Sequence, residues 1–217
     1  MKKLTLIAAA SAALLSPVLS HAESAVNTAA VVGSVVSAKL NFTVVIPSVL
    51  YLAVGQNTAF AANAGVDSLV FTVPSTNIGD STAITGVGGD QLAGAVTVRV
   101  FSNVGGATGN VNLNSTTTGQ LTNGTDFIPW TQIAVAPGAL GTATSGFTNG
   151  AITHPPFNNA VGGGVGATPT LLTAVGKVVR QEGKWTFTYA NTAAYPAGTY
   201  GGTALKNGIV TYTATAL

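Results

Sequence analysis

The chain has 217 residues, of which 6% are charged and 47% are apolar, and it contains 27 glycines and no cysteine. The lack of cysteine excludes disulfides and thiolate metal sites, while the length is enough for one or two sandwich-sized units with their own core. Eight basic residues face six acidic ones, and the cations are scattered rather than gathered in a patch. The composition therefore predicts no nucleic-acid partner.

The first residues have the pattern of an export signal. Lys2 and Lys3 precede an apolar run over residues 4–15, and Ser20-His21-Ala22 has the small-x-small form of a cleavage site. We expect residues 1–22 to be a signal peptide and the product to pass through the periplasm to the cell surface or the extracellular space. Loss of Lys2 and Lys3 leaves six basic against six acidic residues, and a low net charge favours association.

Later apolar residues alternate with polar ones or are broken by glycine and proline, so the sequence predicts no membrane insertion.

One side-chain parity runs through residues 26–46. Its even positions are mostly apolar and include Val26, Ala30, Val32 and Val36. A period of two predicts a β-ribbon with one apolar face. At roughly 3.3 Å per residue this ribbon would span about 70 Å, too long for one ordinary strand. We therefore expect it to bend, change sheets or leave its own domain, and we assign residues 23–37 as a strand extension that could be donated to another copy.

The middle of the chain is rich in β-forming residues and turn signals. Strands are expected over residues 49–54, 68–73 and 95–101, and residues 95–114 have the pattern of a hairpin around Gly105-Gly106. Asn123-Gly124 predicts a tight turn, and a strand over residues 127–135 contains Pro129. Because proline lacks an amide donor, that strand should lie at an edge or contain a bulge.

Residues 137–169 are mostly small, polar or proline residues. So long a stretch without periodicity is uncommon inside a compact domain, so we expect an excursion with one or two short strands, exposed on the outside. It contains His154, which is the one histidine after Ala22 and is expected in a solvated loop. β-pattern resumes over residues 171–179.

The last strands carry the largest apolar side chains. Trp185, Phe187 and Tyr189 share one face of a strand, and Tyr212 shares one face of a strand over residues 210–216. Large aromatics dominate core energetics, so these four residues are the predicted centre of the core, on two adjacent strands. The whole pattern predicts an all-β fold, with the sandwich over residues 38–217.

A resemblance supports this interpretation. Trp185-Thr-Phe, Pro196-Ala-Gly-Thr-Tyr200 and the alternating block from Val210 to Ala216 resemble the closing strands of bacterial exported β-sandwich subunits of the fimbrial and spore-coat-U type, and more loosely WxL-type surface domains. The resemblance implies a Greek-key, immunoglobulin-like sandwich. It also implies a pilus-like or biofilm-matrix role and leaves open an export or assembly chaperone as a partner.

The sequence offers no catalytic constellation. One histidine gives no basis for a Ser-His-Asp triad. Asp80 and Asp90 fall in one glycine-rich loop, where solvated turn residues are expected rather than paired acids or a calcium site. Trp130 beside Pro129 is a candidate for an exposed sugar-contacting ring, although core burial is the expected state. We predict no enzyme activity, no cofactor and no metal.

Two functions remain open. The first is a structural subunit that forms a homopolymeric filament, in which Val26, Ala30, Val32 and Val36 of one copy complete the sheet of the next by donor-strand addition. The alternative is a secreted monomeric sandwich that binds a carbohydrate or a surface ligand, with the ribbon folded back on its own domain.

Overall fold

The structure, a computed structural model, describes residues 23–56 and 60–217. The expected signal peptide at residues 1–22 lies outside the described residues. Contacts divide the chain between Ile46 and Pro47, which is C-terminal to the boundary expected after Ser37. We call residues 23–46 the tail and residues 47–217 the sandwich unit, and each is described by itself.

The tail contains no strand, and its chain turns at residues 28–29 and 32–33. The second turn is closed by the Ser34 N–H, which donates to the Val31 carbonyl at 2.9 Å, and Gly33 has a φ of +94°. The alternating parity therefore does not form one continuous ribbon in the single chain. The physical reason is that a strand needs a ladder partner, which parity alone does not supply.

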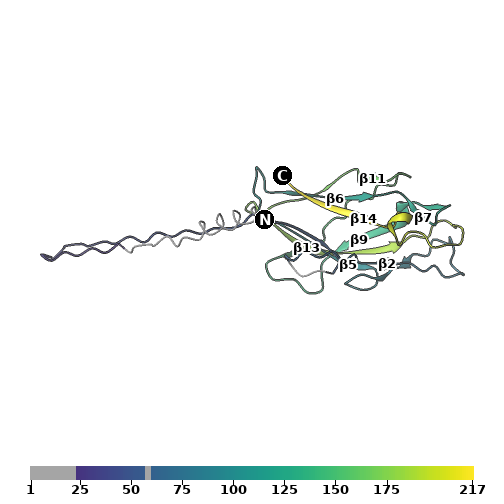
Figure 1. The fold of residues 1–217 in the computed structure, drawn as a ribbon. Helices are drawn as coiled ribbons and strands as arrows, with labels where there is room; N and C mark the ends of the chain where they lie inside the picture. Colours follow the sequence, from purple (N-terminus) through teal and green to yellow (C-terminus); the bar gives the residue numbers. More distant parts are fainter. Residues whose placement is uncertain (1–22, 57–59) are drawn as a thin grey trace, which may run out of the picture. The chain divides into compact units, whose positions relative to one another are not determined.

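The sandwich unit is all-β, which confirms the predicted fold class. Figure 1 shows its strands in two layers, with β13, β5 and β9 in one and β6, β14 and β11 in the other. The first sheet has the order β1 (Leu50–Val54), β5 (Ala95–Ser102), β13 (Val179–Tyr189) and β10 (Thr148–Asn149); β3 (Ile84–Thr85) and β9 (Ile133–Gly138) also pair with β13. The Greek-key connectivity stays a prediction.

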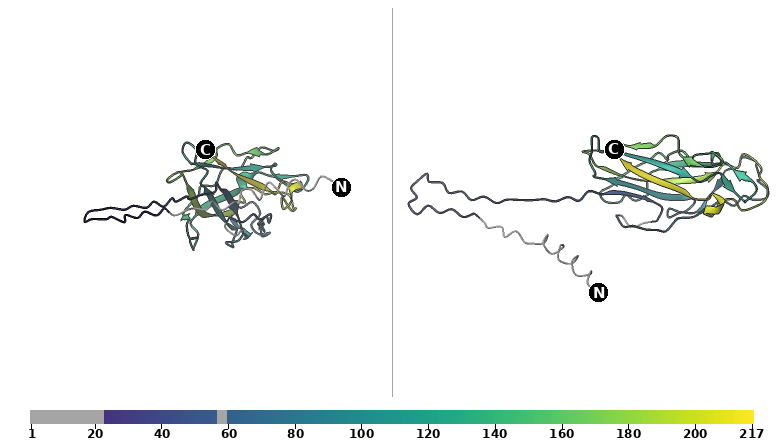
Figure 2. Two further views of the ribbon diagram at one scale, coloured as in Figure 1. Left: turned by 60° about the vertical axis from the view of Figure 1, so that its left-hand side comes forward. Right: turned by 45° about the horizontal axis from the view of Figure 1, so that its top comes forward.

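The second sheet is built on β6 (Val111–Thr117). On one side β6 pairs along its whole length with β14 (Val210–Ala216), and on the other it pairs with β11 (Gly164–Val165) and β12 (Thr170–Leu172). Figure 2 shows β14, in yellow, beside β6. Two small ladders complete the unit: β2 (Leu69–Val70) with β4 (Val87–Gly88), and β7 (Leu121–Thr122) with β8 (Phe127–Ile128).

Local chemistry explains several element boundaries. The predicted strand over residues 127–135 is interrupted after Pro129 by the 3-10 helix η2 (Trp130–Gln132), and β9 follows. A second 3-10 helix, η3 (Ala204–Lys206), ends at Asn207, whose φ of +56° is left-handed. Asn123-Gly124 forms the predicted turn between β7 and β8, closed by the Asn123 N–H, which donates to the Asp126 carbonyl.

Two pairings differ from the sequence expectation. Strands β5 and β6 belong to different sheets, so residues 95–114 cross between layers and form no hairpin. Likewise β13 and β14 lie in opposite sheets and are not adjacent strands. The apolar parity of a strand shows which of its faces is buried. It does not show whether another strand of the same parity lies beside it in the sheet or opposite it across the core.

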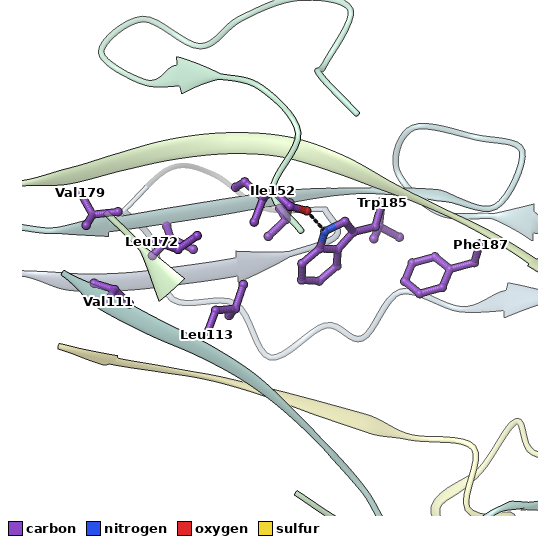
Figure 3. Close-up of a cluster of buried hydrophobic side chains, with 10 residues drawn as sticks. Val111, Leu113, Ile152, Leu172, Val179, Trp185 and Phe187 are labelled. Carbon is purple, nitrogen blue, oxygen red and sulfur yellow. Dashed lines mark hydrogen bonds between the residues drawn. The ribbon is translucent and has the colours of Figure 1, made fainter. Parts of the chain in front are cut away.

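The core lies between the sheets. Its fully buried members include Val98 and Val100 from β5 and Val111 and Leu113 from β6, with Trp185 at the centre. In Figure 3 the Trp185 indole lies between the side chains of Ile152 and Leu113, with Phe187 beside it. Alternation of buried and partly exposed residues along β6 follows from the strand period of two.

The outer face of the first sheet holds a buried ion pair. Glu182 on β13 has no exposed surface, and its Oε2 lies 2.8 Å from the Nε of Arg99 on β5. Burial raises the pKa of Glu182, but hydrogen bonds from Arg99 and from the Thr144 N–H together lower it by more. The pKa of Glu182 therefore lies below its usual range. The pair therefore stays ionised near neutral pH and joins two central strands.

Candidate functional site

The tail exposes its apolar side chains. Val26 is 84% exposed and Val32 is fully exposed, while Val36 keeps 57% of its surface in solvent; Ala30 is exposed as well. The same is true of Val31, Val35, Leu40, Phe42, Val44, Val45 and Ile46. The tail's charges are Glu23 and Lys39 alone. A contiguous exposed apolar segment of this kind marks an interaction surface or an aggregation liability.

The chain is fixed where the sandwich unit begins. The Asn103 side chain accepts a hydrogen bond from the Val49 N–H at 2.6 Å and donates to the Pro47 carbonyl at 2.8 Å. At the other end of the same β5–β6 connection, the Asn110 carbonyl accepts a bond from the Leu217 N–H. The start of the sandwich unit and the end of β14 are therefore held by one connection at the same end of the unit.

Residues 150–159, which we call the strap, belong to the excursion expected over residues 137–169, which contains the short strands β10 and β11. The strap packs against both sheets, with Ile152 and Pro155 buried and Thr153 and Pro156 exposed. Its carbonyls accept hydrogen bonds from side chains of both sheets. The Trp185 Nε1–H donates to the Ile152 carbonyl at 2.7 Å, as Figure 3 shows. Ser115 and Thr117 of β6 donate to the carbonyls of Pro156 and Asn158, each at 2.8 Å.

His154 lies on the strap among aromatic rings, contrary to the solvated loop expected for it. Its ring centroid is 4.6 Å from those of both Phe157 and Trp185, and its Nε2 is 2.8 Å from the Tyr212 hydroxyl oxygen. Burial lowers the pKa of His154 to about 4, against a hydrogen bond to the Pro155 backbone that raises it. Burial also raises the pKa of Tyr212, so at neutral pH both groups are uncharged and share the hydrogen bond between Nε2 and the hydroxyl.

The candidate acids do not meet. Asp80 accepts a hydrogen bond from the Thr82 N–H at 2.8 Å, and this bond is the main reason that its pKa is lowered. Asp90 accepts one from the Thr97 N–H at 2.7 Å. Asp80 therefore holds the turn at residues 80–82, and Asp90 ties its loop to β5. Within residues 23–56 and 60–217, no group of three or more His, Cys, Asp or Glu could hold a metal ion.

Trp130 is no exposed ring. It is 6% exposed, its Nε1–H donates to the Gly119 carbonyl at 2.6 Å, and its ring lies 4.8 Å from that of Phe157. The ring is thus almost wholly buried and does not form an exposed platform for a sugar.

Three of the four predicted core residues are buried, and the fourth is partly exposed. Trp185 is fully buried, and Phe187 and Tyr189 are 6% and 7% exposed. Tyr212 packs against the same core from the opposite sheet and remains partly exposed. Its hydroxyl end is the buried part, because it faces His154.

A cleft of about 370 Å³ lies between β9 and the strap. We call it the strap cleft. Its lining is uncharged and mainly apolar, with hydroxyl and amide groups at the rim: Trp130, Thr131, Ile133, Val135, Pro137, Thr153, His154, Pro156, Phe157 and Asn159. This cleft could not be predicted from the sequence, because it forms only where the edge of β9 and the strap pack side by side.

Strand β9 borders the strap cleft and is an edge strand. Among the described residues it pairs with β13 only. The Ala190 N–H donates to the Gln132 carbonyl, which fixes the alternation of bonded pairs, so the N–H groups of Ile133 and Val135 point away from β13. Pro137, also at an outward position, has no N–H. The Ile133 N–H is already bonded to the Trp130 carbonyl, so the open edge presents one donor, the Val135 N–H, beside the cleft.

Strand β14 is the corresponding edge of the second sheet. It pairs with β6 only among the described residues. The Leu217 N–H bonds the Asn110 carbonyl, so the outward amides belong to Val210, Tyr212, Ala214 and Ala216. The unit thus has an unpaired edge in each sheet.

In the part of the chain that the structure describes, no helix is long and apolar enough to span a bilayer. Comparison of the chain with protein families, curated proteins and solved structures finds no match.

Proposed function

We propose that this protein is a structural subunit of a cell-surface or extracellular filament and that its tail joins the sheet of a neighbouring copy. The observation that carries the proposal is the exposure of the tail. Its valines are apolar, uncharged and β-branched, yet 57% to 106% of their surface is in solvent, while the sandwich unit has a core of its own.

The mechanism is β-strand addition. The backbone of residues 23–37 would pair with an open strand edge of the next copy, and Val26, Ala30, Val32 and Val36 would bury their shared face against it. Such a partner supplies the ladder that the isolated tail lacks and covers an edge that otherwise invites aggregation.

The geometry of repeated assembly favours a filament. The tail of one copy and the receiving edge of another are different surfaces, so the contact is head-to-tail, and a head-to-tail contact that does not close generates an open fibre. The near absence of charge, 6% of the whole chain, lowers the repulsion between copies. An export or assembly chaperone is compatible with this route, because the tail would need cover before a neighbour arrives.

Negative-stain microscopy of the exported protein at rising concentration tests the proposal. We expect filaments from the intact protein and discrete particles from a variant lacking residues 23–37, since the sandwich unit remains but the donor is gone. The matched control is Thr28→Ser. It keeps a small hydroxyl side chain at this position of the tail and should assemble normally.

Normal filaments from the deletion variant would refute strand donation by the tail. Discrete particles from the intact protein at every concentration would instead favour a monomeric secreted binding module.

A further inference from the structure

We infer that the strap cleft is the site that receives the tail, and that its occupant is the segment from Val26 to Val36 of a second copy. This inference rests on the proposed function and identifies the acceptor surface, which that proposal leaves open. The pairing would place the tail against the outer edge of β9, with its apolar side chains between β9 and the strap.

The chemistry of the strap cleft fits an uncharged apolar chain. Its lining residues include no Asp, Glu, Lys or Arg, and the segment from residue 26 to residue 36 contains none either. A charged or strongly polar ligand would lose its hydration there without an ionic partner. A second copy of this chain supplies an occupant of matching character.

Size selects the first part of the tail. Along one parity, residues 26–36 carry only Val, Ala, Thr and Ser side chains, whereas residues 40 and 42 are Leu and Phe. Small and β-branched side chains suit a cleft of about 370 Å³. Residues 37–46 then remain as the connection between two sandwich units.

The backbone can also pair at this site. The outward N–H of Val135 and the outward carbonyls of Ile133 and Val135 lie beside the cleft, and the side chains of both residues form part of its wall. Pro137 ends the available ladder, which limits the pairing to a short, defined register. The tail's own turns offer little resistance, because their hydrogen bonds are local. Two join Val31 and Ser34, and one joins the Ala29 N–H to the Asn27 side chain.

The border between β1 and β14 is a poorer acceptor. These edge strands of opposite sheets have Cα atoms within 8 Å of each other, although neither pairs with the other. Inserting a strand between two edges needs about twice the 4.7–4.9 Å strand spacing. The strands at this border would therefore have to separate before a further strand could enter.

The cysteine-free sequence permits a direct test by disulfide trapping. The experiment uses the exported protein carrying Val32→Cys together with either Thr131→Cys or Thr153→Cys, two exposed residues on opposite walls of the strap cleft. The matched control is Val32→Cys with Thr213→Cys, an exposed residue of β14. Mild oxidation is followed by denaturing electrophoresis without reductant, and tryptophan fluorescence checks that each variant is folded.

We expect a ladder of disulfide-linked oligomers from at least one cleft pair and at least tenfold less from the β14 pair. Filaments that cross-link through Thr213→Cys and not through either cleft residue would overturn the inference while leaving strand donation intact. Cross-linked monomers, formed within one chain, would overturn the inference as well. Failure of the parent protein to form filaments would overturn the proposed function itself.

Discussion

Acid should destabilise the sandwich unit through His154. Its pKa is about 4 in the folded protein and about 6.5 in an unfolded chain. The unfolded state therefore binds more protons between these two pH values. The stability that a neutral His154 contributes is present above pH 6.5 and is lost as the pH falls toward 4. With 1.36 kcal/mol per pKa unit, the loss is about 2 kcal/mol at pH 5 and approaches about 3.4 kcal/mol below pH 4.

The residues around His154 contain no compensating charge. Its ring faces Phe157 on the strap, Trp185 and Phe187 on β13, and Tyr212 on β14. Charged Glu182 and Lys184 of β13 have the opposite parity to Trp185 and so project from the other face of the sheet. Protonation thus places an unpaired charge in an aromatic environment.

Urea unfolding followed by tryptophan fluorescence at pH 7 and pH 5 measures the effect. The control is His154→Gln. Its side chain can still accept a hydrogen bond from the Tyr212 hydroxyl, but it has no titrating ring. The wild type should lose about 2 kcal/mol more than this variant between the two pH values. Equal losses in both proteins would refute the burial of a neutral His154.

Three further changes probe the packing of the unit. Trp185→Ala should cost about 3 to 5 kcal/mol in urea unfolding, and less in filaments if the neighbour's tail adds binding energy; equal losses in the two forms would count against that coupling. Arg99→Ala should cost about 3 to 5 kcal/mol because it leaves the buried Glu182 carboxylate without its cation, and a negligible change would show that the pair is solvated. Gly163→Ala, at a φ of +70° with the Thr117 carbonyl in the way, should lower stability by more than about 1 kcal/mol. Gly162→Ala, which has open space, should not; a shared loss would refute the steric argument.

The sequence predicted the fold class because strand periodicity is a local property. The alternation of Val96, Val98 and Val100 predicts β5 directly, and Asn123-Gly124 predicts its turn. Sheet membership could not be predicted in the same way. Strands β13 and β14 share an apolar parity whether they are neighbours or face each other across a core, so the pattern carries no information on the choice.

The strap was missed for a related reason. The run His154-Pro155-Pro156 has few amide donors and no periodicity, which are features of an exposed loop. In the structure, side chains such as those of Ser115 and Trp185 donate hydrogen bonds to the carbonyls of the strap. The strap therefore needs no neighbouring strand, and its lack of amide donors and of periodicity is compatible with a packed position. Inward-facing hydroxyls on β6 were the available signal, because a buried Ser or Thr requires an acceptor.

The most direct test of the account is hydrogen–deuterium exchange of the tail before and after assembly. In the single chain the amides of residues 26–36 are in no ladder, so they should exchange at nearly unprotected rates. In filaments, strand addition predicts strong protection of alternate amides in this segment. Filaments whose tail amides exchange as fast as those of the single chain would contradict strand donation.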